Sequence, residues 1–288
     1  MKMKMKRNKL IAFLILLLAV TVMVYAGGQL SETNKSYRES SAAYEDIKDR
    51  VRINQTAGLR IDPQPNILSE LSELSKTAQP SMDMEDPPET TAEVYIPKLE
   101  IDFETLKSFS KDAAAWLYSP DTAIDYPVMK ASDYSYYLNR LPDGTKNASG
   151  SLFIDYNCAS DFSGQLTVIY GHHMKSGSMF GSLKKYKEQA YYEKHPFMYL
   201  YTEQGNYRID LLYGCVIGAG QWINRGFIYA ENIEELLAYA EKNTTFKKNN
   251  TERVRSLYTE KDRLIVLSTC SYEFDGARYV VIGTLNKA

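Results

Sequence analysis

A cysteine and an arginine lie on two neighbouring stretches of the chain that are each typical of a β-strand. The stretch from Leu264 to Cys270 begins with a short unbroken apolar run, as in a strand buried on both faces. A short turn with an Asp-Gly pair leads into a second strand-like stretch, Arg278 to Ile282. Antiparallel pairing would bring Arg278 back toward Cys270. Because a nearby cation favours the thiolate, Cys270 is a candidate nucleophile; the alternative is a cysteine that only packs as a small apolar residue.

The second reactive group is a pair of adjacent histidines at the end of another predicted strand. Thr167 to Tyr170 is apolar and is followed by a glycine, His172 and His173, in a chain with only three histidines. One interpretation is acid and base catalysis by His172. The other is a zinc site made of both histidines and a cysteine. Adjacent residues on an extended chain point to opposite sides, and no metal-type spacing accompanies the pair, so we expect no metal.

Several motifs around these residues resemble the sortase family. Leu267-Ser268-Thr269-Cys270 is similar to the family's Thr-Cys signature at a strand end, with an arginine at the start of the next strand, and Tyr170-Gly171-His172 is similar to its histidine motif. Residues 150–156, 161–162 and 171–180 look like class B sortases in particular. The resemblance covers roughly Tyr95 to the C-terminus.

The resemblance implies a fold, a site and an activity. The fold would be mainly β, an eight-stranded sortase barrel with peripheral helices. Cys270 would be the nucleophile, His172 the acid and base, and Arg278 the cation beside the oxyanion or a group that binds the substrate backbone. No cofactor would be needed. The enzyme would be a cysteine transpeptidase of a Gram-positive bacterium that cleaves a C-terminal sorting signal of exported proteins after a Thr.

The acyl group would pass through a Cys thioester to an amine of the peptidoglycan precursor or peptide bridge, which would anchor the protein to the cell wall. Three alternatives stay open at the level of the sequence. One is an exported cysteine peptidase that ends in hydrolysis, one is a sortase that polymerises pilins, and one is a non-catalytic wall-binding module.

The chain from Tyr95 onward reads as short strands with few helices, which favours a closed barrel. A strand over 124–129 carries Pro127 and is predicted to lie at an edge. A hairpin is predicted over 198–219. Helices are predicted from apolar spacing or composition over 103–116, 132–141, 181–192 and 232–246.

The composition is that of an ordinary globular protein and gives no sign of a nucleic-acid partner. The 288 residues carry a formal net charge of -2, and the 23 tyrosines lack the interleaved basic residues that single-strand binding needs. The three cysteines, Cys158, Cys215 and Cys270, are odd in number and widely spaced, which argues against a disulfide framework. Cys215 lies in an apolar run and is expected to be buried.

The N-terminus predicts a membrane anchor. Residues 1–9 carry basic side chains and no acidic ones, and residues 10–26 form an apolar run that, at about 1.5 Å per residue, can cross most of a hydrocarbon core. The positive charge places this end in the cytoplasm and the catalytic domain outside, in a single-pass cell-membrane protein. A cleaved signal peptide is the alternative.

The region between the anchor and the barrel contains two segments of different composition. Residues 36–51 are polar and suit a solvated juxtamembrane helix, whereas Pro63, Pro65, Pro80, Pro87 and Pro88 indicate a poorly ordered spacer. We therefore predict a tail and transmembrane anchor over 1–30, a helix and spacer over 31–91, and the catalytic domain over 92–288.

Overall fold

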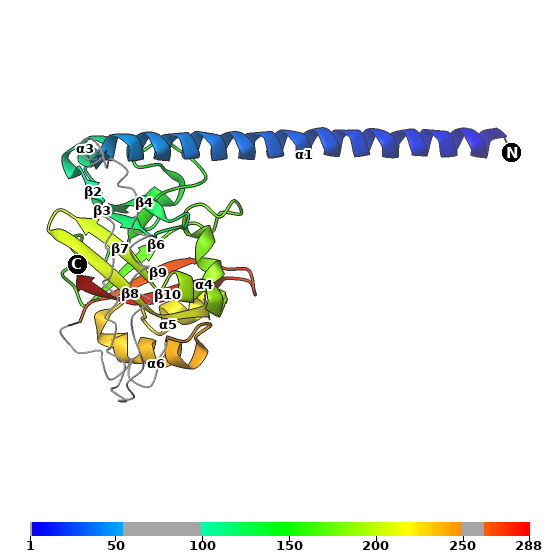
Figure 1. The fold of residues 1–288 in the computed structure, drawn as a ribbon. Helices are drawn as coiled ribbons and strands as arrows, with labels where there is room; N and C mark the ends of the chain where they lie inside the picture. Colours follow the sequence, from blue (N-terminus) through cyan, green and yellow to red (C-terminus); the bar gives the residue numbers. More distant parts are fainter. Residues whose placement is uncertain (1, 54–98, 249–261) are drawn as a thin grey trace, which may run out of the picture. The chain divides into compact units, whose positions relative to one another are not determined.

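The computed structural model describes residues 2–53, 99–248 and 262–288. The predicted Pro-rich spacer, the predicted start of the catalytic domain at residue 92 and Tyr95 lie outside these ranges. The chain divides into two compact units, one of residues 1–51 and 101–288 and one of residues 52–100. The catalytic residues predicted from the sequence all belong to the first unit, which is drawn with the rest of the chain in Figure 1.

Eight strands of the described residues close into a barrel, as predicted, in the order β10-β8-β7-β3-β4-β5-β6-β9. The barrel strands are β3 (Ala113–Tyr118), β4 (Asp125–Lys130), β5 (Leu152–Ile154), β6 (Leu166–Tyr170), β7 (Phe197–Thr202), β8 (Gly205–Gly218), β9 (Leu264–Cys270) and β10 (Ala277–Lys287). The short strands β1 (Arg52–Ile53) and β2 (Glu100–Ile101) lie outside the barrel. Closure leaves no free sheet edge in the barrel.

The described residues also form helices. They are α1 (Lys2–Val51), α3 (Phe103–Phe109), α4 (Gln189–Lys194), α5 (Ala219–Asn224) and α6 (Ile233–Asn243), with 3-10 turns η2 (Tyr136–Asn139), η3 (Phe180–Lys187) and η4 (Ala230–Asn232). Helix α6 packs against β8, as Figure 1 shows, and α5 contacts the same strand. The predicted helix over 232–246 and hairpin over 198–219 are confirmed.

Strand β9 is apolar at every position from Leu264 to Leu267 because both of its faces are covered. Ile265 and Leu267 belong to the core cluster inside the barrel. Leu264 and Val266 belong to a second cluster on the outer face, which α5 and α6 cover with Trp222, Ile233 and Leu237 among others. Alternate residues of a strand point to opposite faces, so two covered faces require the unbroken apolar run seen in the sequence.

The prediction that Pro127 marks an edge strand is wrong. Strand β4 pairs antiparallel with β3, where Pro127 lies opposite Trp116, and it pairs in parallel with β5. The β5 pairing begins at Val128, one residue after the proline. The missing N–H of Pro127 therefore falls before the β5 ladder, which is how an inner strand tolerates it.

The predicted helix over 103–116 is only half correct. Helix α3 begins after Asp102, whose carboxylate accepts a hydrogen bond of 2.9 Å from the Thr105 N–H, and it ends at Phe109. Trp116 lies on strand β3, so its helical spacing from Leu106 was coincidental. The helix predicted over 132–141 is a 3-10 turn, and the one over 181–192 divides into η3 and α4.

Helix α1 runs without a break from the apolar segment through the predicted juxtamembrane helix. From Leu16 onward it includes a stretch long and apolar enough to cross a membrane, judged by length and composition. Residues 36–51 are helical, as predicted, but the prediction that this helix is solvated is wrong. Ser40, Tyr44, Ile47 and Val51 are buried at helical spacing, and Tyr44 joins the barrel core.

We predict that Leu267→Ala lowers the free energy of unfolding by about 2–5 kcal/mol, because it leaves a cavity beside the barrel core. Leu267 is fully buried, whereas Leu138 is 41% exposed. The matched variant Leu138→Ala should therefore lose less than half as much. Urea denaturation followed by fluorescence measures both, and equal losses in the two variants would contradict the assigned core.

Candidate active site

Two strand pairings bring the predicted reactive residues to one end of the barrel. Strand β6 pairs in parallel with β9, and the register runs to Tyr170 opposite Ser268. His172 and Cys270 each follow two residues later, so they leave the two strands at the same level. On the other side of β9, Arg278 is the direct antiparallel partner of Cys270. Because neighbouring strands lie roughly 4.8 Å apart, the three side chains reach one site.

His172, Cys270 and Arg278 line one groove, whose volume is about 630 Å³. The other lining residues come from three parts of the fold. In and after α5 they are Trp222, Ile223, Ile228 and Tyr229, and around η2 and β5 they are Tyr134, Leu138, Phe153 and Tyr156. At the ends of β6 and β9 they are Tyr170, Gly171, Ser268 and Thr269. These walls are largely apolar, and Cys270 is exposed. An open apolar groove with a few polar groups at one place suits an extended peptide.

The two adjacent histidines have different surroundings. The Nε2 atom of His172 contacts the carbonyl oxygen of Leu138. A carbonyl only accepts, so Nε2 carries the hydrogen of this bond and Nδ1 remains without a partner from that contact. His173 instead donates from Nδ1 to the carbonyl oxygen of Cys270, at 2.8 Å, and does not line the groove. That bond fixes the backbone at Cys270. Within the described ranges, no three His, Cys, Asp or Glu side chains group together in a way that could hold a metal ion.

A glycine and a threonine hold the ends of β6 and β9 together. The Thr269 hydroxyl donates to the carbonyl oxygen of Gly171 at 2.7 Å, and the Gly171 N–H donates to the carbonyl oxygen of Ser268 at 3.1 Å. A Cβ atom on Gly171 would collide with the side chains of Leu152 and Phe180, so only glycine fits. These two bonds therefore fix the end of β9 against the end of β6, so that Cys270 and His172 stay at the same level.

Arg278 lies over an aromatic ring in the groove. Its guanidinium carbon is 5.9 Å from the centre of the Tyr170 ring, a cation–π distance. Its Nε atom is buried and has no hydrogen-bond partner among the described residues. A guanidinium has five N–H donors, so Arg278 retains donors for a ligand in the groove.

A buried carboxylate that the sequence analysis missed fixes the tyrosine under Arg278. Asp155 is fully buried and its Oδ2 accepts hydrogen bonds from the hydroxyls of Tyr170, at 2.8 Å, and Tyr134, at 3.0 Å. Burial, and then the Asp155 charge, raises the pKa of Tyr170 far above its usual range, so this phenol stays neutral. Asp155 lies within residues 150–156, one of the segments that resemble class B sortases, but the sequence does not show that its side chain is buried.

The three cysteines are free and differ in exposure, as expected for Cys215. Cys158 and Cys215 are buried, and Cys270 is exposed. Burial raises the pKa of the Cys215 thiol to about 12 and also raises that of Cys158. A raised pKa reduces the thiolate fraction at neutral pH, so neither of these two thiols suits a nucleophile.

We predict that iodoacetamide modifies Cys270 alone in the folded protein between pH 7 and pH 9. The raised pKa and burial of the other two thiols keep them unreactive over this range, which lies below the value for Cys215. Peptide mass spectrometry locates the adduct. The control variant Cys270→Ala should show no adduct, and in urea all three thiols of the unaltered protein should react. An adduct on Cys158 or Cys215 without denaturant would contradict the assignment.

Comparison with known sequences places the chain in a family. The model of the sortase domain matches residues 117–286. Sortase B of Listeria monocytogenes is 32% identical over 184 residues, which is 62% of this chain and 72% of that protein. Sortase B of Staphylococcus aureus is 27% identical over 188 residues, 64% of this chain and 75% of that protein.

Solved structures agree with the sequence comparison. The X-ray structure of Clostridium perfringens sortase B has a TM-score of 0.58 at 26% identity, covering 64% of this chain and 99% of that chain. A Staphylococcus aureus sortase B-substrate complex has a TM-score of 0.57 at 26% identity, covering 65% and 85% of the two chains. With the barrel and the matched domain, these relatives show that the chain belongs to the sortase family and is a cysteine transpeptidase of class B.

Proposed function

We propose that this transpeptidase cleaves a C-terminal sorting signal of exported proteins after a Thr and joins the new carboxyl group to a cell-wall amine. The observation that carries the proposal is the convergence of Cys270, His172 and Arg278 in one groove at the ends of three neighbouring strands. Two relatives support the kind of ligand: one solved structure is a sortase B-substrate complex, and another is sortase B complexed with triglycine.

In the first half of the reaction, the Cys270 thiolate attacks the carbonyl carbon of the scissile amide and a C–S bond forms. The negative charge that develops on the carbonyl oxygen needs donors that are already in place, and the Arg278 guanidinium supplies them. The C–N bond then breaks as protonated His172 gives its proton to the leaving amine. The products are a thioester on Cys270 and the freed C-terminal peptide.

In the second half, the amine of a peptidoglycan precursor or peptide bridge attacks the thioester. Neutral His172 takes a proton from the attacking nitrogen, an amide bond forms and the Cys270 thiolate leaves. The protonation states of both groups are thereby restored. Arg278 has a second possible task, the binding of the substrate backbone, which its free donors would also allow. Neither half needs a metal or a cofactor.

The other outcomes differ only in the acceptor. Water would make the enzyme a cysteine peptidase, and a pilin lysine would make it a pilus polymerase. The exposure of Cys270 does not distinguish between these acceptors, so the likeness to class B sortases is what favours wall anchoring. A non-catalytic binding module is disfavoured because the family is one of transpeptidases.

We predict that Cys270→Ala abolishes both peptide cleavage and transfer, and that His172→Ala lowers the rate by about a hundredfold or more, since a positioned acid and base contributes that much. The matched control Cys158→Ala removes a buried thiol outside the groove and should keep most of the activity. The assay offers a panel of Thr-containing sorting-signal peptides together with triglycine and resolves the products by mass spectrometry.

The product ratio separates transfer from hydrolysis. A transpeptidase should shift most of its product from the free acid to the triglycine adduct as the amine concentration rises. A product ratio that ignores added amine would support the peptidase instead. Full transfer by Cys270→Ala would refute the proposed nucleophile.

We also propose a single-pass membrane protein with a cytoplasmic N-terminus. The organisation would be an anchor over 1–30, a helix and spacer over 31–91 and an external catalytic domain over 92–288. Helix α1 supports it, because it includes a stretch that can cross a membrane and basic residues precede that stretch.

We predict that a protease added to wall-free cells removes the catalytic domain and leaves an N-terminal fragment in the membrane. Lysed cells and a cytoplasmic marker protein serve as controls for leakage. Protection of the catalytic domain in intact cells would contradict the orientation. A mature protein that begins near residue 27 would show that the apolar run is a cleaved signal peptide.

A further inference from the structure

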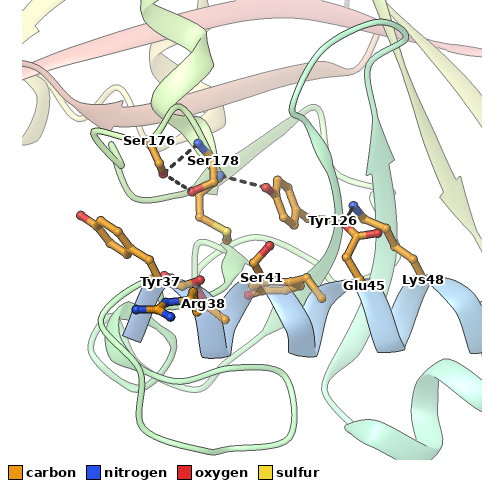
Figure 2. A pocket seen from close by; sticks show the side chains of 12 residues that line it. Tyr37, Arg38, Ser41, Glu45, Lys48, Tyr126, Ser176 and Ser178 are labelled. Carbon is orange, nitrogen blue, oxygen red and sulfur yellow. Dashed lines mark hydrogen bonds and ion pairs between the residues drawn. The ribbon is translucent and has the colours of Figure 1, made fainter. Parts of the chain in front are cut away.

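The last turns of α1 pack against the barrel domain close to the His172 loop. The Ser40 hydroxyl lies 2.8 Å from the hydroxyl of Ser149, and the Asn147 side-chain amide donates to the Ser36 carbonyl oxygen at 3.0 Å. Tyr44 is 4% exposed. A pocket of about 280 Å³ remains between this part of the helix and the loops facing it (Figure 2). The helix is therefore attached through specific contacts.

One route from Tyr44 to His172 runs through the backbone. The Tyr44 hydroxyl donates to the Gly150 carbonyl oxygen at 2.6 Å and lies 3.2 Å from the Ser151 hydroxyl. The Ser151 N–H donates to the Tyr137 carbonyl oxygen at 2.9 Å. The next carbonyl along the chain, that of Leu138, is the one that contacts His172 Nε2. A Cβ atom on Gly150 would lie 2.5 Å from that same Leu138 oxygen, so the two segments are in direct contact.

The second route runs through Tyr126. The rings of Tyr44 and Tyr126 meet edge to face, with centres 5.0 Å apart. The Tyr126 hydroxyl accepts a hydrogen bond of 3.2 Å from the Met179 N–H, and Figure 2 shows this bond reaching across from the barrel wall to the loop with Ser178. Met179 has a φ of 50°, which is unfavourable for its side chain and needs support. The following residue donates its N–H to the His172 carbonyl oxygen at 3.0 Å.

We propose that Tyr44 is a positioning residue for His172. The hydroxyl supports the carbonyl that orients the imidazole, and the ring supports the loop that carries the histidine backbone. Helix α1, which includes the apolar segment, thereby positions the general acid and base, although no described residue of α1 lines the groove. This inference rests on the proposed function, in which His172 is the acid and base.

The test compares Tyr44→Phe with Tyr37→Phe in the full chain in detergent. Both variants remove one hydroxyl from α1 beside the same pocket, but the Tyr37 side chain makes no hydrogen bond among the described residues. We expect Tyr44→Phe to lower kcat about tenfold with KM within twofold, because a displaced acid and base slows the chemical steps and leaves peptide binding intact. Tyr37→Phe should match the unaltered protein.

A spectroscopic readout makes the test independent of turnover. The chain has three histidines, so ¹⁵N-histidine NMR resolves each imidazole, and in Tyr44→Phe the signals of His172 should shift while those of His195 stay. An unchanged kcat and unchanged His172 signals in Tyr44→Phe would overturn the proposal. Failure of the proposed function would look different, since the unaltered protein would then transfer no peptide while the His172 signals still responded to Tyr44. Should Tyr44→Phe not fold, Tyr126→Phe is judged by the same criteria.

Discussion

The parallel pairing of β6 with β9 is the interaction on which the site depends. It sets the ends of two strands from distant parts of the sequence at the same level, so that His172 and Cys270 leave the barrel together. The Thr269 hydroxyl on the Gly171 carbonyl fixes the last step of that register. A slip of one residue would turn one of the two side chains to the opposite face. Arg278 needs no such long-range pairing, because a short turn returns it to Cys270.

The sequence predicted the parts of this site that depend on local pattern. The apolar run of β9, the turn after Cys270 and the pairing of Cys270 with Arg278 are short-range features, and the structure has all three. The closed barrel was expected from the short predicted strands and its strand number from the family resemblance, and both are confirmed. The features that the sequence analysis predicted wrongly or missed depend on contacts between residues distant in the sequence. The position of Pro127 relative to the β5 ladder and the burial of Asp155 under two tyrosines are set by neighbours distant in sequence.

The same reason explains why the role of α1 was underestimated. Its last turns read as a polar, solvated helix because buried positions such as Ser40 and Tyr44 carry hydroxyls. Those hydroxyls find partners on the barrel side, at Ser149 and at the Gly150 carbonyl. Polar groups of this kind can be buried when they are hydrogen-bonded, and a composition-based prediction cannot see the partner. The helix that would reach the membrane is consequently also part of the folded enzyme.

In the proposed reaction, the Cys270 sulfur, the His172 imidazole and the Arg278 guanidinium act on a single acyl carbon. The intermediate can be trapped by mixing the enzyme with a cleavable peptide in the absence of an acceptor amine and digesting the enzyme at acidic pH. We expect a peptide acyl group on Cys270 that neutral hydroxylamine releases, as for a thioester. An acyl group on any other residue, or cleavage that proceeds with no adduct on Cys270 at any time, would contradict it.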